Sequence, residues 1–319
     1  MKLIISELNA LSRYVSREFH HIIKALIETY GWRHLDATEL SGNSRSLKSI
    51  LLESVGELPE IILFWEGYNF LPERAKDLLR LDSRKYIFAD DLHWRDGHMR
   101  YRKFISYLLC DTVLSTYAYV FDQFFPEIAR KREVVWIPHS ASPDFLLRFN
   151  SHAENAIFLS GAINHYYPLR QQMKSLYDSR SYPISYHPHP GYHCGYDHRT
   201  NENVGNGFAN KINSHKAAFT DCLIFNYIVA KYFEIPATGS LLLADMSVNA
   251  AFEQLGFIEN EHYLPVSSDT LEEVIRYALD DSNHSKLDEI RKNGQALVWQ
   301  KHTTGDRARL INETCRAKT

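Results

Sequence analysis

Short apolar runs of strand length alternate with amphipathic stretches of helix length along most of this 319-residue chain. A buried parallel strand reads as a short continuous apolar run, whereas a covering helix repeats its apolar residues every three to four positions. The first half is expected to hold strands at 2–5, 60–65, 85–89, 112–115 and 134–138, and helices near 17–30, 47–55, 72–79, 101–109 and 117–124. The alternation predicts an α/β fold, with a parallel sheet covered by helices on both faces.

The alternation stops after Pro138 and then starts again. Residues 139–143 follow neither period, and 148–155 is polar. Later strands are expected at 156–159, 183–186, 216–220, 240–244 and 263–266, with helices near 270–280, 284–301 and 306–315. The interruption predicts two domains. They are an amino-terminal Rossmann-like domain at 1–140 and a carboxyl-terminal one at 156–302, with a last helix in 303–319 that packs back on the first.

Composition excludes several classes of protein. The net charge of -3, from 36 Lys+Arg and 39 Asp+Glu, gives no bias toward polyanions, so no nucleic-acid partner is expected. The four cysteines form no C-x-x-C pair, which disfavours a disulfide framework and a cysteine zinc site. The first apolar run is too short for a signal peptide, and no segment approaches the ~20 apolar residues of a membrane span. We therefore expect a cytoplasmic protein without a transmembrane segment that acts on a small molecule.

The most informative motif runs from Lys231 to Asp245 and reads KYFEIPATGSLLLAD. It predicts a helix that ends at a glycine turn and feeds a buried strand ending in aspartate. Lys231 and Glu234 are three positions apart and share one helix face. A carboxylate beside a cation near a helix start suits a ribose diol next to a phosphate. A surface salt bridge on a helix capped by Gly239 fits the spacing equally well.

This motif resembles the group-1 GT-B glycosyltransferases, especially the branch that contains spore-coat CgeB-like proteins. Their helix reads like Phe-Glu-x-x-Ala-x-Gly before an apolar strand and an aspartate. The resemblance, mostly over 156–266, implies two Rossmann-like domains facing a central cleft, with the nucleotide-sugar donor on the carboxyl-terminal side. It implies that Glu234 binds the donor ribose and that Lys231 lies near the donor phosphates. Many relatives contact the donor sugar through a glutamate eight positions earlier, where this chain has Asn226.

A second motif, from Phe158 to Arg170, predicts a strand, a loop of small residues and a helix. Gly161 permits close backbone approach, the amides that follow favour an anion, and Arg170 offers a fork for phosphate oxygens. A glycine turn and a solvated helix arginine are also common without any function. The resembling family has a glycine turn and a Tyr-Pro-x-Arg-like stretch at this place, which supports a donor-binding role. Lys216 is a further candidate for the donor diphosphate.

The segment Asp90-Asp91-Leu92-His93-Trp94 follows an expected strand, so its side chains should lie at the carboxyl edge of the sheet, where ligands bind. The family often places a histidine or an acidic residue of this loop beside the transferred sugar. This implies roles for His93 and Asp91 in sugar positioning or proton handling. For Asp90 and Trp94, a helix cap and a packed indole are equally good interpretations.

The histidine-rich stretch from His187 to His198 holds five nitrogen or sulfur ligands beyond Asp197, which raises a metal site as an alternative. Two prolines and two glycines give this loop no preset tetrahedral frame. The resembling family has an ordinary cleft loop here, so His189 and His193 are expected to line the donor cleft and no metal is expected. No Asp-x-Asp motif, dinucleotide fingerprint or P-loop occurs in the sequence.

The sequence therefore predicts a GT-B glycosyltransferase that moves a sugar, hexosyl being the expected class, from a UDP- or GDP-sugar to a glycan or other hydroxyl acceptor. The resemblance implies that it retains anomeric configuration and requires no cofactor or metal. Two alternatives stay open. One is a noncatalytic GT-B-like protein that binds a nucleotide or a glycan, and the other is a metal-dependent hydrolase that uses the histidine-rich loop.

Overall fold

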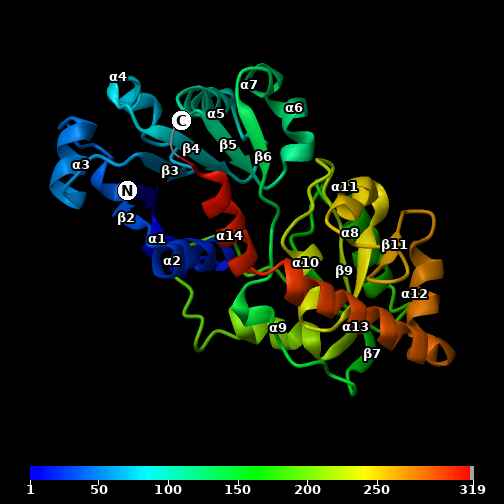
Figure 1. Cartoon of the computed structure of the whole chain (residues 1–319). Coiled ribbons are helices and arrows are strands. Elements are labelled where there is room, and N and C mark those ends of the chain that lie inside the picture. The colour runs from blue at the N-terminus through cyan, green and yellow to red at the C-terminus, as the bar shows by residue number, and fades with distance from the viewer. Residues whose placement is uncertain (317–319) are drawn as a thin grey trace. The chain divides into compact units, whose positions relative to one another are not determined.

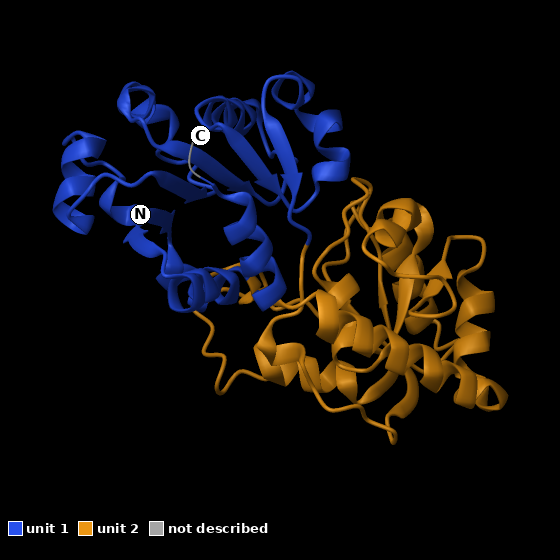
Figure 2. Ribbon diagram, in the orientation of Figure 1, with its two compact units in different colours: residues 1–12, 19–138, 305–319 blue, residues 13–18, 139–304 orange. Residues whose placement is uncertain are grey.

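The computed structural model describes residues 1–316. The chain divides into two compact units (Figure 2). Unit 1 comprises residues 1–12, 19–138 and the chain from 305 onward, and unit 2 comprises 13–18 and 139–304. Each unit is an α/β layer structure (Figure 1). Each also has its own hydrophobic core.

Unit 1 is built on a parallel sheet in the order β2-β1-β3-β4-β5-β6. β3 is a fully buried apolar run, and β4 is buried and apolar from residue 86 to residue 89, as expected for a sheet covered on both faces. The sequence did not predict β2, which contains Leu35 as its one apolar residue and pairs only with β1 at the sheet edge. The strands are β1 (Lys2–Ser6), β2 (Arg33–Asp36), β3 (Ile61–Trp65), β4 (Arg84–Ala89), β5 (Thr112–Ser115) and β6 (Glu133–Trp136).

Helices cover this sheet, and the last of them comes from the end of the described chain. In α14 the side chain of Asn312 accepts hydrogen bonds from Lys2 Nζ at 2.9 Å and from Trp32 Nε1 at 3.0 Å. Ala308 and Ile311 of α14 lie in the same core as β1 and β3. The helices are α1 (Leu8–Ser12), α2 (Glu18–Tyr30), α3 (Leu47–Val55), α4 (Ala75–Arg80), α5 (Gly97–Leu108), α6 (Phe121–Phe124), α7 (Pro126–Ala129) and α14 (Thr304–Thr314).

Unit 2 has a second parallel sheet in the order β11-β10-β9-β7-β8. The order places β7, β9 and β10 side by side in the middle of the sheet, so the loops that follow these strands meet at one edge. The strands are β7 (Glu154–Gly161), β8 (Ile184–Pro188), β9 (His215–Thr220), β10 (Leu241–Asp245) and β11 (Leu264–Val266).

The long helix α13 fixes the end of the short helix α10. Gln295 and Trp299 of α13 donate hydrogen bonds to the carbonyl of Ala237, at 3.2 and 2.9 Å, and Arg291 donates one to Gly239 at 2.8 Å. The carbonyls that a helix end leaves open are thus satisfied by side chains. The helices of unit 2 are α8 (Pro168–Asp178), α9 (Gly205–Asn213), α10 (Lys231–Ala237), α11 (Asn249–Gln254), α12 (Leu271–Leu279) and α13 (His284–Lys301). Short 3-10 helices lie at Ala37–Glu39, Pro72–Arg74, Ala118–Val120, Pro143–Phe145, Met246–Val248 and Asp281–Asn283.

The early segment 13–18 belongs to unit 2 because its side chains are bound there. Arg17 pairs with Asp144 at 2.5 Å. The buried carboxylate of Glu18 accepts the backbone N–H of Ser140 at 2.6 Å and its hydroxyl at 2.8 Å, and lies 2.7 Å from Nδ1 of His139. One carboxylate thus joins the start of the chain to the residues that follow Pro138.

Candidate functional site

The turn after β7 is shaped around a glycine. Gly161 has a φ of +111°, a backbone conformation that side chains rarely adopt. A Cβ at this position would lie 2.7 Å from Nη1 of Arg170 and 3.5 Å from Nζ of Lys231. Glycine is therefore required here both by the backbone conformation and by the close approach of two cationic side chains.

Arg170 is locked in a buried ion pair. Its side chain is 3% exposed, and its guanidinium lies 2.6 Å from the carboxylate of Asp221, which is 1% exposed. Asp221 also accepts the backbone N–H of Arg170 at 2.9 Å, and Nη1 of Arg170 donates to the carbonyl of Ala162 at 3.0 Å. Burial raises the pKa of Asp221, and Arg170 opposes this rise. The first turn of α8 and the guanidinium are thus already engaged by protein groups, and the arginine holds the Gly161 turn in place.

Helix α10 carries two charged side chains that the protein leaves unpaired. Lys231 is half-buried and Glu234 is 6% exposed. Within residues 1–316, neither the ammonium nor the carboxylate forms a hydrogen bond or an ion pair, with each other or with another group. They share a helix face as the spacing predicted, but they do not form the surface salt bridge that was the alternative. Buried charges are normally paired, so two unpaired ones on one face are typical of a ligand site.

Burial also shifts the titration of this pair. Burial, and then the charge of Arg170, lower the pKa of Lys231. Burial raises the pKa of Glu234. Lys231 and His139 lower this pKa, whereas Glu18 and Asp144 raise it further. Both shifts disfavour the charged form because no partner replaces water. A ligand that offers an anion to Lys231 and hydroxyl donors to Glu234 would supply what is missing.

The loop after β8 starts beside the Gly161 turn, because Pro188 pairs with Gly161 in the strand register, and His189 is its first residue. Burial lowers the pKa of His189 to about 4, and the nearby charges of Lys231 and Arg170 add to this effect. Nδ1 of His189 accepts the backbone N–H of Gly191 at 2.9 Å, and its ring lies 4.1 Å from that of Tyr192. The structure therefore gathers four of the predicted residues of unit 2, Gly161, Arg170, Lys231 and His189, with Glu234 on the same helix face.

Three other predicted residues are placed differently. Asn226 lies in the loop between β9 and α10, is exposed, and has a φ of +56°. His193 is exposed and stacks on Tyr196 at 4.2 Å. Lys216 is the second residue of β9, at the edge opposite to the Gly161 turn, and its Nζ lies 3.0 Å from both ring nitrogens of His284. The structure does not bring Lys216 to the cluster.

In unit 1, a buried lysine of α5 binds the backbone of the loop after β4. Nζ of Lys103, on α5, donates to the backbone carbonyls of Asp91 and, at 3.0 Å, of His93. Nδ1 of His93 lies 3.9 Å from the carboxylate of Asp91. Burial and the charge of Lys103 lower the pKa of His93, which keeps its imidazole neutral near pH 7. Trp94 packs on Phe125 at 5.7 Å, as the packed-indole alternative predicted.

A carboxyl group beside this loop was not predicted from the sequence. Glu66 follows β3, and its φ of +60° is rare for a residue with a side chain. Burial and then Asp90 raise the pKa of Glu66 to about 8, although Lys103 acts in the opposite direction. The sequence signal is a Glu-Gly pair directly after a buried strand. Asp221, missed in unit 2, has the same kind of signal, an aspartate directly after β9.

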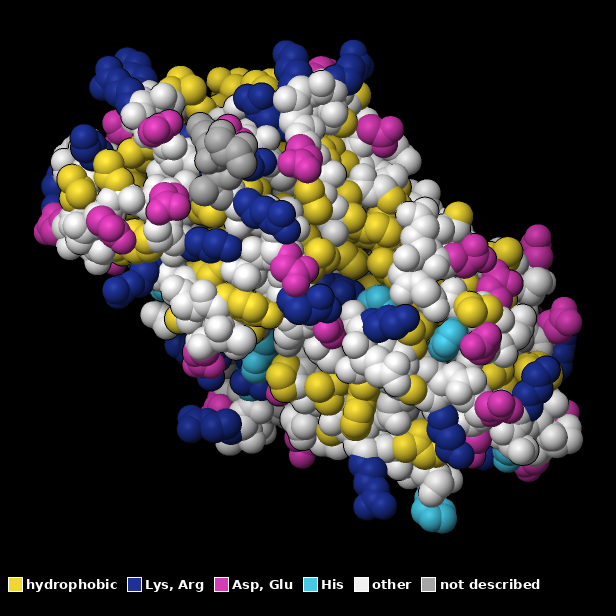
Figure 3. All heavy atoms as spheres, viewed as in Figure 1, with side chains coloured by type: hydrophobic (Ala, Val, Ile, Leu, Met, Phe, Trp, Pro, Cys, Tyr) yellow, Lys and Arg dark blue, Asp and Glu magenta, His cyan; other side chains and the backbone are white. Residues whose placement is uncertain are grey.

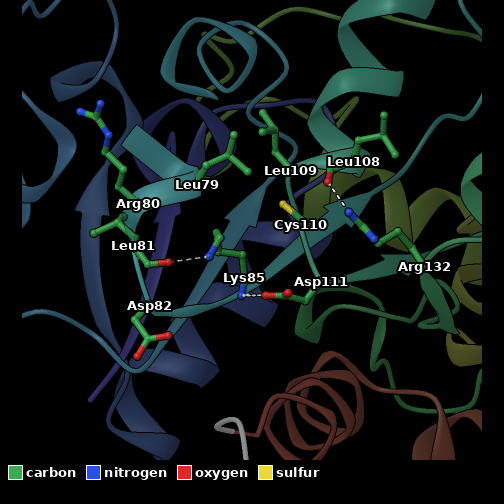
Figure 4. Close-up of a pocket in the computed structure, with 10 residues that line it drawn as sticks. All are labelled: Leu79, Arg80, Leu81, Asp82, Lys85, Leu108, Leu109, Cys110, Asp111 and Arg132. Atoms are coloured by element: carbon green, nitrogen blue, oxygen red, sulfur yellow. Dashed lines mark hydrogen bonds between the residues drawn. The ribbon is translucent and has the colours of Figure 1, made fainter. Parts of the chain in front are cut away.

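A polar pocket in unit 1 lies at the other edge of its sheet (Figure 4). The start of β4 and the ends of α4 and α5 line it, whereas Asp91 and His93 follow the end of β4. Two of its cations are engaged by carbonyl groups: Lys85 Nζ donates to Leu81 at 3.0 Å, and Arg132 donates to Leu108 at 2.7 Å. The pocket is therefore separate from the predicted site residues.

The described residues show neither a metal-ligand cluster nor a spanning helix. No three His, Cys, Asp or Glu side chains within 1–316 gather as metal ligands would, and this includes the histidine-rich loop. Over the same residues, none of the helices is both long and apolar enough to cross a bilayer. On the face seen in Figure 3, basic and acidic side chains are interspersed.

A family of known proteins matches part of the chain. Residues 176–313 match the family described as "Glycosyl transferase-like". The matched region contains His189, Asp221, Lys231 and Glu234, whereas Gly161 lies before it. No curated protein sequence matches the chain significantly.

Solved structures share the fold over the whole chain. HepE of Anabaena in complex with UDP-glucose is 10% identical, with 98% of this chain and 99% of that chain covered and a TM-score of 0.60. Sucrose-phosphate synthase of Thermosynechococcus elongatus is 11% identical, with 98% of each chain covered and a TM-score of 0.62. An alpha-glucosyltransferase in complex with UDP and DNA is 9% identical, with 98% of each chain covered and a TM-score of 0.60. At such identities the likeness concerns the fold alone.

Fold and site together define a GT-B protein built from two parallel α/β units, which confirms the predicted fold class. The glycosyl transferase-like match over 176–313 supports the resemblance to the group-1 glycosyltransferases that the sequence indicated.

Proposed function

We propose that this protein transfers a sugar from a UDP- or GDP-sugar to a hydroxyl acceptor, a glycan being the expected class. The unpaired Lys231 and Glu234 carry this proposal, because a nucleoside diphosphate supplies the two partners that they lack. Its phosphate oxygens accept from the Lys231 ammonium, and its ribose hydroxyls donate to the Glu234 carboxylate. UDP in the solved structures of HepE and the alpha-glucosyltransferase supports the uridine nucleotide as the first ligand to test.

The proposed donor site is built around the Gly161 turn. The Gly161 turn offers backbone approach to the diphosphate beside Lys231, and the Arg170–Asp221 pair keeps the turn rigid. Asn226 stands where relatives contact the donor sugar and would offer an amide in place of a carboxylate. In this scheme Lys231 and the turn stabilise the diphosphate as the anomeric C–O bond breaks and its electron pair moves to the diphosphate. The acceptor oxygen bonds to the anomeric carbon and its proton is released.

The remaining features of the proposal concern the acceptor and the cell. His93 and Asp91 position the sugar or take up the acceptor proton, and the neutral imidazole of His93 suits that role. Lys231 supplies positive charge at the leaving group, which supports a metal-independent reaction, and the family resemblance supports retention of configuration. The free thiols Cys110, Cys194, Cys222 and Cys315 support a reducing compartment such as the cytoplasm.

Calorimetric titration with UDP, uridine and pyrophosphate tests the donor site. Lys231→Ala should weaken UDP and pyrophosphate by about tenfold or more but leave uridine unchanged, since an ammonium–phosphate hydrogen bond contributes about 1.5–3 kcal/mol. Glu234→Ala should weaken UDP and uridine but not pyrophosphate. Lys286→Ala, which removes an exposed lysine of α13, is the matched control. Equal losses with all three ligands, or none, would contradict these assignments.

One observation favours a second function. Asn226 replaces the carboxylate that relatives use for the donor sugar, so a protein that binds the nucleotide without transferring the sugar is the alternative. UDP release from UDP-glucose in the presence of candidate acceptors distinguishes the two. Tight UDP binding without release or product would favour the binding protein.

A further inference from the structure

His189 directly follows Pro188, which pairs with Gly161 in the register of β7 and β8, so it comes from the strand beside the turn that Lys231 approaches. Its ring packs 4.1 Å from that of Tyr192. Tyr167, whose pKa is raised by burial and then by the neighbouring Tyr192, lies over the guanidinium of Arg170 at 3.9 Å. The half-buried ring of His189 thus packs within the loop after β8, next to the Gly161 turn.

The hydrogen bond to Gly191 fixes which ring nitrogen carries the proton. The backbone N–H of Gly191 donates to Nδ1 of His189 at 2.9 Å, so Nδ1 is the acceptor and the neutral ring has its proton on Nε2. Burial, together with Lys231, Arg170 and His187, lowers the pKa of His189 to about 4, so the ring is neutral at physiological pH. Within the described chain, Nε2–H has no protein acceptor.

We propose that His189 binds the donor diphosphate as a neutral hydrogen-bond donor, through Nε2–H, next to the Lys231 ammonium. This inference rests on the proposed function, because it requires that Lys231 and Glu234 hold a nucleoside diphosphate. A neutral donor suits this place, since a third positive charge beside Lys231 and Arg170 would be repelled in the empty site. Nε2–H adds a directional contact to the phosphate without that repulsion.

The test compares two amide replacements of the imidazole. In His189→Gln the amide N–H can reach about as far as Nε2, whereas in His189→Asn it reaches only about as far as Nδ1. Calorimetry at pH 7.5 with UDP should give an affinity for His189→Gln within about threefold of the wild type. His189→Asn should bind UDP about tenfold more weakly, as expected for the loss of one hydrogen bond to a charged acceptor.

Uridine is the control ligand, because it has no phosphate. The proposal expects the same uridine affinity in the wild type and both variants. It is overturned if His189→Asn binds UDP as tightly as His189→Gln does, or if the asparagine variant loses uridine affinity to the same extent as UDP affinity. Wild-type protein that binds UDP no more tightly than uridine would instead refute the proposed donor site itself, and the role of His189 with it.

Discussion

The carboxyl group of Glu66 should make unit 1 less stable as the pH rises, and Glu66→Gln should remove this effect. Burial and Asp90 raise the pKa of Glu66 from its ordinary value of 4.5 to about 8. The folded state therefore holds the proton more tightly than the unfolded state, so stability is lost as the pH rises from about 4.5 through about 8. The full difference corresponds to about 5 kcal/mol. Because Glu66 keeps some contact with solvent, we expect about 2–3 kcal/mol.

Urea unfolding followed by circular dichroism at pH 5.0 and 8.5 measures this effect. Glu66→Gln should match the wild type at pH 5.0, where the glutamic acid is protonated in the folded protein. It should exceed the wild type by about 2–3 kcal/mol at pH 8.5, where only the wild type must bury a charge. Glu57→Gln, at an exposed glutamate of unit 1, is the control and should show no such gain. A Glu66→Gln advantage that is equal at both pH values would refute the argument.

Three further predictions concern unit 2. Gly161→Ala should destabilise the protein by about 1–3 kcal/mol and weaken UDP binding, because the φ of +111° and the 2.7 Å approach of Arg170 leave no room for a Cβ. An unchanged free energy of unfolding in denaturant would contradict this. Asp221→Asn should cost about 3–5 kcal/mol by leaving the buried Arg170 unpaired, and adding Arg170→Met should recover part of this loss in a double-mutant cycle, whereas additive losses would argue against the pair. Glu18→Gln should cost about 2 kcal/mol in urea unfolding through weakened bonds to His139 and Ser140, and a change below about 0.5 kcal/mol would show that the carboxylate is not needed there.

Most of the two sheets could be predicted because their strands are buried on both faces. Thr112–Ser115 was predicted with its observed bounds, and β3 and β4 within one residue, since each is an apolar run between polar turns. The edge strand β2 was not predicted, because a single buried leucine does not make an apolar run or an alternating pattern. Helix α5 starts at Gly97, earlier than predicted, because Asp96 caps it by accepting the N–H of Met99 at 2.9 Å. Caps thus extended a helix beyond its periodic residues.

The candidate site could be predicted only where residues are close in sequence. Lys231 and Glu234 share a helix face by their spacing alone, and Gly161 marks the end of a strand. Asp221 follows a different strand, and nothing in the sequence indicates that it meets Arg170, which is 51 positions away. Lys216 failed to join the cluster for a related reason. A residue at the start of a strand lies at the wrong edge of the sheet, whatever its charge.

The contrast between Arg170 and Lys231 shows how the fold divides tasks between two cations that lie against the same glycine turn. Arg170 has a carboxylate, a carbonyl and an aromatic ring as partners. Its guanidinium is therefore bound by protein groups and its position is fixed. Lys231 has the Phe208 ring at 6.0 Å but no anion within ion-pair distance among the described residues. A phosphate that enters the turn therefore meets one cation that is free to bind and one that already holds the turn rigid. Replacing Arg170 should disturb UDP binding through the shape of the turn, whereas replacing Lys231 should remove the contact itself.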